Sequence, residues 1–115
     1  MKEYALLFRM DITNPDAQPT EEQMDIYMDQ WNEWINDIVE EGQLADGGGH
    51  FSKQGRVLRP NNKIDEQPYT DNNSSLAGFI IVLSDDMEGA TAIARRCPIL
   101  NGENTSVEIR ALGAP

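Results

Sequence analysis

Two short segments of this chain are apolar at every position, and this pattern limits the fold more than any other feature. They are residues 4–8 (YALLF) and residues 76–83 (LAGFIIVL). Side chains along a strand alternate between the two faces of a sheet, so a continuous apolar run indicates a strand that is buried on both faces. Both runs are far shorter than the roughly 20 residues that span a bilayer. We therefore expect the two segments to be the central strands of a sheet.

The first helix is predicted by a capping box and an apolar stripe. Thr20 and Gln23 are spaced for the box, and Gly42 is placed to end the helix. Apolar side chains recur at three- and four-residue spacing between them, as in an amphipathic helix. The stripe consists of Met24, Tyr27, Met28, Trp31, Ile35 and Ile38. We interpret it as core packing, with Trp31 or Trp34 placed to line any cavity.

A second helix is expected after residue 83. Ser84 or Asp85 would cap it, and Pro98 would end it, because proline cannot continue a helix. The inner face is expected to consist of Met87, Ala90, Ile93, Ala94 and Cys97. The same face makes a buried, inert thiol the favoured interpretation of Cys97.

The remaining strands are less regular. Glycines 47–49 lack the Gly-Lys-Ser/Thr sequence of a phosphate loop, so they indicate a bend or bulge in an edge strand. Residues 56–59 read as a short strand after a turn, and a polar loop follows over residues 60–75, with a short strand near Lys63. Residues 105–112 alternate between apolar and polar side chains, which is typical of an edge strand.

These elements predict one α+β domain over residues 1–115. The order βαββαβ folds with right-handed crossovers into a ferredoxin-like unit, a four-stranded antiparallel sheet with two helices on one face. The other face of the two central strands is also apolar and would stay uncovered in a monomer. We therefore expect a homodimer, a dimeric α+β barrel in which two sheets face each other and enclose a cavity.

Charge and cysteine content narrow the function. The net charge is −11, and there is no Lys or Arg between Met10 and Ser52. Binding to nucleic acid or to an anionic membrane depends on basic clusters, so neither is expected. The single cysteine rules out an internal disulfide and a multi-cysteine metal site. We expect no metal and no cofactor, and with no export signal we expect a cytoplasmic protein.

Charged residues on the uncovered sheet face are the first candidates for a site. By strand parity, Arg9, Glu108 and Arg110 lie there, and Tyr69 in the loop before the third long strand is expected nearby. Two interpretations stay open. The three could form a Glu–Arg pairing that fixes the dimer, or the arginines could bind a small anionic ligand through their planar forks.

Two other features have simpler explanations. His50 is the only histidine and has no evident partner, so an exposed or edge-strand histidine is favoured over a catalytic base. Carboxylates recur every four residues along the first helix, which is typical of a solvated helix face. Metal ligands must converge on one point instead. This row consists of Asp25, Asp29, Glu33 and Asp37.

The chain as a whole resembles the YCII-related family, and its DGPF branch in particular. The resemblance rests on five pieces in order: residues 1–9 (MKEYALLFR), a Pro-Thr-Glu-Glu helix start at residues 19–22, Trp31 with Trp34-Ile35, residues 96–100 (RCPIL) and residues 107–110 (VEIR). The Asp-Gly-Pro-Phe motif of the branch corresponds to residues 66–69, which read Glu-Gln-Pro-Tyr here.

The resemblance implies a dimeric α+β barrel and leaves two functions open. Family members carry a histidine in the first helix and an aspartate before the proline of the second, and these suggested enzyme activity. Trp31 and Cys97 stand at those positions here. This favours a non-enzymatic accessory or small-ligand-binding protein. The alternative is a cofactor-independent enzyme that resembles the lactone isomerases and small monooxygenases built on the same barrel.

Overall fold

A computed structural model describes residues 1–113 of the chain, apart from residues 15 and 17. Its main sheet has the strand order β2–β6–β1–β7, and every pairing is antiparallel. The elements in chain order are β1 (Lys2–Asp11), α1 (Glu21–Glu40), β2 (Leu44–His50), β3 (Val57–Arg59), β4 (Lys63–Asp65), β5 (Thr70–Asp71), β6 (Ser74–Ser84), α2 (Met87–Arg95), the 3₁₀ helix η2 (Pro98–Asn101) and β7 (Ser106–Ala111).

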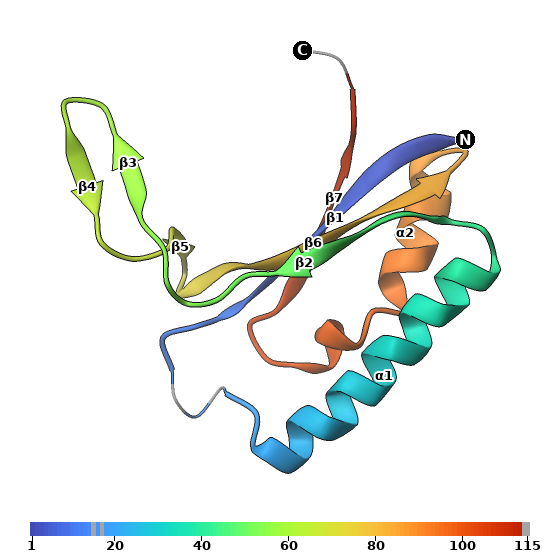
Figure 1. Ribbon diagram of the computed structural model, residues 1–115, viewed down its shortest axis with the longest axis horizontal. Coiled ribbons are helices and arrows are strands. Elements are labelled where there is room, and N and C mark those ends of the chain that lie inside the picture. Colours follow the sequence, from blue (N-terminus) through green and yellow to red (C-terminus); the bar gives the residue numbers. More distant parts are fainter. Residues whose placement is uncertain (15, 17, 114–115) are drawn as a thin grey trace.

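The topology confirms the predicted ferredoxin-like α+β fold. The two doubly apolar segments form the central strands β1 and β6, and the glycine-rich β2 and the alternating β7 are the edges. Both helices lie on one side of the sheet (Figure 1). Two details differ from the predicted four strands. A two-residue strand, β5, extends the sheet beside β6, and β3 pairs with β4 in a separate hairpin.

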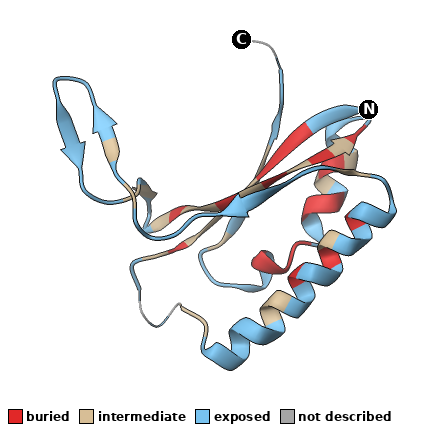
Figure 2. Cartoon of the chain, in the orientation of Figure 1, coloured by how far each residue is buried: buried red, intermediate tan, exposed pale blue. Residues whose placement is uncertain are grey.

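The core lies between the sheet and the two helices. On this face β1 contributes Tyr4, Leu6 and Phe8, and Figure 2 shows the buried residues concentrated in this layer. Leu6 of β1 and Ile38 of α1 are both completely buried. The indole N–H of Trp34 donates a hydrogen bond of 3.1 Å to the carbonyl of Ile93, which fastens α1 to α2. Because the indole donor is satisfied, the large ring can stay in the core without a desolvation penalty.

The first helix begins where the capping box predicts. The Thr20 hydroxyl accepts a hydrogen bond from the backbone N–H of Gln23 at 3.2 Å, and the Gln23 side chain accepts one from the N–H of Thr20 at 2.9 Å. The carboxylates at positions 25, 29, 33 and 37 are all exposed, as expected for a solvated face.

The start of the second helix was predicted wrongly. Asp86 is the N-cap: its carboxylate accepts from the N–H of Gly89 at 2.8 Å, while the Ser84 hydroxyl donates to the carbonyl of Asp86 at 2.9 Å. The helix therefore begins later than expected, and Met87 is its first residue and 42% exposed. The other four predicted inner residues are buried, and α2 ends at Arg95, before the 3₁₀ helix that Pro98 begins.

The glycine run forms the predicted bulge in β2. The pairing with β6 is irregular between Leu44 and Asp46 and again between Asp46 and Gly49. Gly48 has a φ of +61°, and a Cβ at this position would collide with the carbonyl oxygen of Phe79. Only glycine combines the left-handed conformation with so close an approach of two backbones. The Asp46 carboxylate accepts a hydrogen bond from the Gly48 N–H at 2.7 Å and holds the turn.

The sheet face away from the helices is uncovered in the single chain. We call this surface the open face; its apolar members are Ala5, Leu7, Phe79, Ile81 and Leu83. These side chains point away from the core. In the register Leu7 pairs with Phe79, whereas the buried Leu6 pairs with Ile80, so the two pairs lie on opposite faces of the sheet. Leu7 of β1 is only partly buried, and so are Phe79, Ile81 and Leu83 of β6.

The β3–β4 hairpin stands apart from the main sheet and rises on the side of the open face (Figure 1). We call residues 53–66 the arm. Leu58 and Ile64 are direct partners across it and are 75% and 51% exposed. Two ion pairs lie within it, Arg59–Asp65 at 2.7 Å and Arg56–Glu66 at 2.8 Å. A two-stranded hairpin with an exposed apolar pair has little stability by itself.

Candidate functional site

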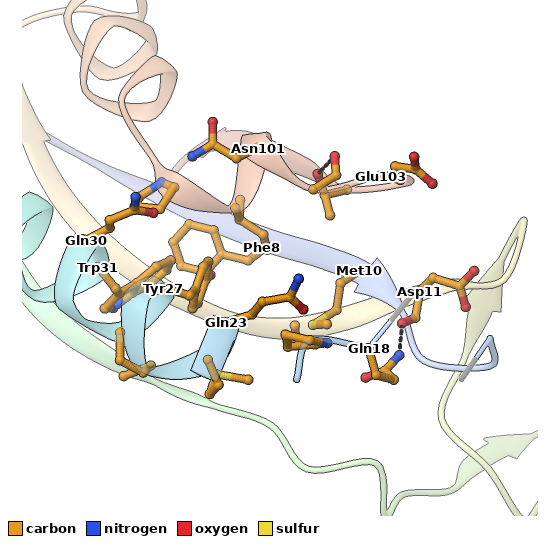
Figure 3. Close-up of a pocket in the computed structure, with 18 of the residues that line it drawn as sticks. Phe8, Met10, Asp11, Gln18, Gln23, Tyr27, Gln30, Trp31, Asn101 and Glu103 are labelled. Carbon is orange, nitrogen blue, oxygen red and sulfur yellow. Dashed lines mark hydrogen bonds between the residues drawn. The ribbon is translucent and has the colours of Figure 1, made fainter. Parts of the chain in front are cut away.

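A cavity of about 700 Å³ lies on the helix side of the sheet, between the first half of α1, the adjacent ends of the long strands and the segment from η2 to β7. We call it the interlayer pocket, and Figure 3 shows side chains from all three regions pointing toward it. Its size is that of a small-molecule site. The residues that line it are Phe8, Met10, Asp11, Asp16, Gln18, Pro19, Gln23, Met24, Tyr27, Met28, Gln30, Trp31, His50, Phe51, Ala77, Pro98, Ile99, Asn101, Gly102, Glu103 and Thr105.

The floor of the interlayer pocket is a cluster of rings around Trp31. Its ring centroid is 4.9 Å from that of Phe8 and 5.9 Å from that of Tyr27, and the imidazole of His50 lies 5.4 Å away on the β2 side. Trp31 is only 6% exposed because these rings and Trp34 surround it. The rings hold one another in place, so the floor is preformed.

The polar part of the pocket is organised by Asp11 at the end of β1. Its carboxylate accepts hydrogen bonds from the backbone N–H and the hydroxyl of Thr13, at 2.8 and 2.9 Å, and from the N–H of Asn14 at 3.1 Å. The hydrogen bonds from Thr13 lower the pKa of Asp11 below its usual value, so this carboxyl is ionised at neutral pH. The Gln18 amide donates to the Asp11 carbonyl at 2.8 Å, which ties the loop before α1 to β1 (Figure 3).

Two further titratable groups lie in or beside the floor, the Tyr27 hydroxyl and the Cys97 thiol. Burial raises the pKa of the Cys97 thiol to about 12 and also raises the pKa of the Tyr27 hydroxyl. Both groups are therefore neutral at physiological pH. Cys97 is 3% exposed, which agrees with the predicted buried thiol, and a neutral buried thiol is a poor nucleophile.

The charged residues predicted on β1 and the last strand come together on the open face, as strand parity predicts. This face is the opposite side of the sheet from the interlayer pocket. Arg9 contacts Glu108 at 3.4 Å and Arg110 contacts it at 3.3 Å, and all three lie on the open face beside Leu7. Hydrogen bonds from Arg110, and then from Arg9, lower the pKa of the Glu108 carboxyl. One carboxylate thus serves two guanidinium groups, and these three residues together carry one positive charge.

The other two predicted residues lie elsewhere. His50 lies in the interlayer pocket, because the β2 register pairs it with Gly78 and directs it to the helix side. Tyr69 is 59% exposed, and the guanidinium carbon of Arg59 lies 5.7 Å from its ring centroid. It packs against the arm, and the five candidates do not form a single cluster.

Much of the interlayer pocket was not predicted as a site. The stripe on α1 was interpreted as core packing, and Trp31 indeed lies in the core while also lining the pocket. Only the structure shows that α1 extends past the sheet that it covers: Met24, at the start of the stripe, is 39% exposed. The contributions of Asn101 and Glu103 could not be foreseen, because a turn brings them to the pocket.

Neither a cluster of metal ligands nor a membrane-spanning helix is found among the described residues. Within the described residues, no group of three or more His, Cys, Asp or Glu side chains is placed to hold a metal ion. None of the described helices combines the length and the apolar character that a membrane span requires.

Comparison with known proteins agrees with the fold and the sequence pieces described above. Curated proteins give no match. The model of one family, the YCII-related domain, matches residues 6–112, which run from the middle of β1 through both helices to the end of β7. The match covers nearly all of the 115 residues. The chain therefore belongs to the YCII-related domain family.

Proposed function

We propose that this YCII-related domain is a non-enzymatic homodimer that binds a small molecule in the interlayer pocket. The observation that carries the proposal is the pocket itself, about 700 Å³ with a floor of packed rings and a polar rim. Small-molecule sites combine mostly apolar walls with a few polar groups that fix the orientation of the ligand. Gln23, Gln30 and Asn101 supply amide groups of this kind, and Figure 3 shows them at the edge of the rings.

Several features favour binding over catalysis. Asp11, the most buried carboxylate of the pocket, is already engaged by three hydrogen bonds from its own loop. Tyr27 and Cys97 are held neutral by burial. A general base needs a pKa near neutrality and a free hydrogen-bonding position, and none of these three groups offers both.

The enzyme alternative rests on His50, whose imidazole lies at the pocket wall beside Trp31. Isomerisation of a lactone or oxygenation of a phenol requires proton transfer, which an imidazole can perform. Turnover of a molecule found in the pocket, abolished in His50→Gln with binding retained, would favour this alternative.

A homodimer is supported by the open face. Leu7, Phe79 and Ile81 form adjacent apolar pairs across β1 and β6, and a second copy packed on them would remove them from water. A standard interface buries roughly 1,600 Å² in total, and apolar burial contributes roughly 25 cal/mol per Å² before the cost of association. The second copy would form the dimeric α+β barrel expected from the sequence.

The arm supports the same partner through charge. Four of the nine basic residues and two of the twenty acidic residues lie between 53 and 66, so the arm carries +2 while the rest of the chain carries −13. Because the arm rises beside the open face, a second copy on that face would place its acidic body next to the arm. Leu58 and Ile64 would gain an apolar neighbour there.

The pocket is tested by filling it. Native mass spectrometry of the purified protein should detect a retained small molecule, and a neutral apolar dye such as Nile red should bind with enhanced fluorescence. Met24→Trp, at the pocket mouth, should lose both, whereas Ile26→Trp should keep them because Ile26 is exposed on α1 outside the lining. The proposal would be contradicted if the wild-type protein retains no small molecule and also fails to bind the dye at about 100 µM, a concentration that would reveal even weak binding.

The dimer is tested by charge insertion. Ile81→Lys should convert a dimer at roughly 10 µM into a monomer in sedimentation velocity, because the lysine would be buried without a partner. Ile26→Lys, on the exposed side of α1, is the matched control and should leave the dimer intact. A wild-type monomer at that concentration would contradict the homodimer while leaving the interlayer pocket unaffected.

The ionic cluster of the open face offers a second binding position. Arg9 and Arg110 share Glu108, so one positive charge is available for a small anion between the two sheets. Arg110→Ala distinguishes the two interpretations left open by the sequence. Loss of dimer stability would identify a structural pair, and loss of anion binding from an intact dimer would identify a ligand anchor.

A further inference from the structure

The charges around the interlayer pocket are one-sided. Asp11, Asp16 and Glu103 line it, and the described residues that line it include no lysine or arginine. The Asp11 carboxyl is ionised, as shown above, and the other two side chains are exposed. The positive end of the α1 dipole, which would favour an anion, is opposed by Glu21 and Glu22 in its first turn. The carboxylates around the pocket therefore favour a positively charged ligand over an anion.

The rings of the floor suit the same sign of charge. The faces of Trp and Tyr rings carry a partial negative charge and attract cations within about 6 Å of the ring centroid. Trp31 and Tyr27 lie side by side with centroids 5.9 Å apart, and Met28 from the same helix adds a polarisable sulfur. An organic cation could therefore pack its apolar body on the rings while its ammonium group lies toward the acidic rim.

We propose that the ligand of the interlayer pocket is a small organic cation: an amine or quaternary ammonium with an apolar body that packs on the ring floor. The ammonium group would lie toward Asp16 and Glu103, and the body would lie against Phe8, Tyr27 and Trp31. This inference rests on the proposed function, since it specifies the ligand class of that same pocket. It also separates the pocket from the open face, where the net charge at Arg9 and Arg110 is positive.

Three probes of similar size and shape test the sign of the charge. Phenethylamine is a cation at neutral pH, 2-phenylethanol is neutral and 3-phenylpropionate is an anion. Their affinities can be compared by displacement of Nile red and by the fluorescence of Trp31 in a Trp34→Phe background. We expect phenethylamine to bind about fivefold or more tightly than 2-phenylethanol, and 3-phenylpropionate to bind most weakly.

Rim variants locate the effect. Glu103→Gln and Asp16→Asn should each weaken phenethylamine about two- to fivefold, the range for an exposed ion pair, and should leave 2-phenylethanol unchanged. Asp25→Asn removes the same charge from the exposed side of α1 and should have no effect. Rising salt should narrow the preference for the cation, because exposed charges are screened.

The outcomes separate the two proposals. If Nile red binds in the pocket but the three probes compete equally, or the anion competes best, the cation inference is overturned and the binding function stands. If Nile red binds and none of the probes displaces it up to about 10 mM, the cation inference is likewise overturned. If Nile red itself fails to bind, or binds equally to Met24→Trp, the proposed function fails.

Discussion

Gly48→Ala tests the bulge of β2, because it adds one methyl group where the structure has no room for it. Gly48 has a φ of +61°, and the left-handed conformation costs a non-glycine residue roughly 1–2 kcal/mol. The new Cβ would also collide with the Phe79 carbonyl, and forced repacking of this kind costs roughly 1–3 kcal/mol. Alanine restricts the unfolded chain and returns roughly 0.4–1 kcal/mol. We expect a net loss of about 1–4.6 kcal/mol in the free energy of unfolding.

The neighbouring glycines are matched controls. A Cβ on Gly47 or Gly49 meets no atom within 4 Å, and neither residue has a positive φ. Alanine at either position should therefore change the free energy of unfolding by less than about 0.5 kcal/mol. Gly48→Asn separates the two contributions, because asparagine tolerates the left-handed conformation but still carries the colliding Cβ. The free energy of unfolding of Gly48→Asn should exceed that of Gly48→Ala by no more than about 1 kcal/mol.

Urea unfolding followed by tryptophan fluorescence measures these differences. With a slope of about 1.5 kcal/mol per molar, the Gly48→Ala midpoint should fall by about 0.7–3 M. The free energies of unfolding of Gly48→Ala and Gly47→Ala should therefore differ clearly. If they agree to within about 0.5 kcal/mol, which is roughly the effect of a neutral surface change, the backbone of β2 does not approach Phe79 as described and the reasoning is refuted.

Three further predictions concern other parts of the molecule. Thr20→Ala removes the N-cap of α1 and should lower the free energy of unfolding by about 1 kcal/mol in the same urea assay. The pKa of Asp11 is lowered in the fold, so its contribution to stability is present above the ordinary value of 3.8 and is lost as the pH falls through the lower folded value. Thermal unfolding followed from roughly pH 5 down to roughly pH 2 should show this loss, and Asp11→Asn should reduce it. Cys97, with its pKa raised from 9.0 to about 12, should react with iodoacetamide at pH 7.5 about a thousandfold more slowly than a free thiol, until urea unfolds the chain. Equal rates in the folded and unfolded protein would contradict its burial.

The fold was accessible from the sequence because its signals are local and agree with one another. The double apolar pattern identified the central strands, the capping box identified the start of α1, and the run of glycines at 47–49 indicated a bend or bulge. The start of α2 was missed because Ser84, Asp85 and Asp86 can all cap a helix. The choice depends on which of them can bond Gly89 while the strand keeps its pairing to the end.

The site was accessible only in part. Strand parity correctly grouped Arg9, Glu108 and Arg110 on one face, because parity depends on the backbone alone. The interlayer pocket depends instead on how far α1 extends past the sheet and on the turn that brings Glu103 to its rim. Both are properties of tertiary packing between segments some 80 residues apart, and no periodicity in the sequence encodes them.

The irregular pairing of β2 has a consequence for polymerisation. The free side of an edge strand offers a row of backbone donors and acceptors, and an intact row can recruit a strand from another molecule and begin a fibre. In β2 the ladder shifts twice, around Asp46 and Gly49, so its outer side does not present a continuous row. A strand arriving there would find only a few positions in register. Edge-to-edge growth is thus disfavoured on this side of the molecule, whereas the proposed homodimer would use the open face, where two sheets can close on each other and stop.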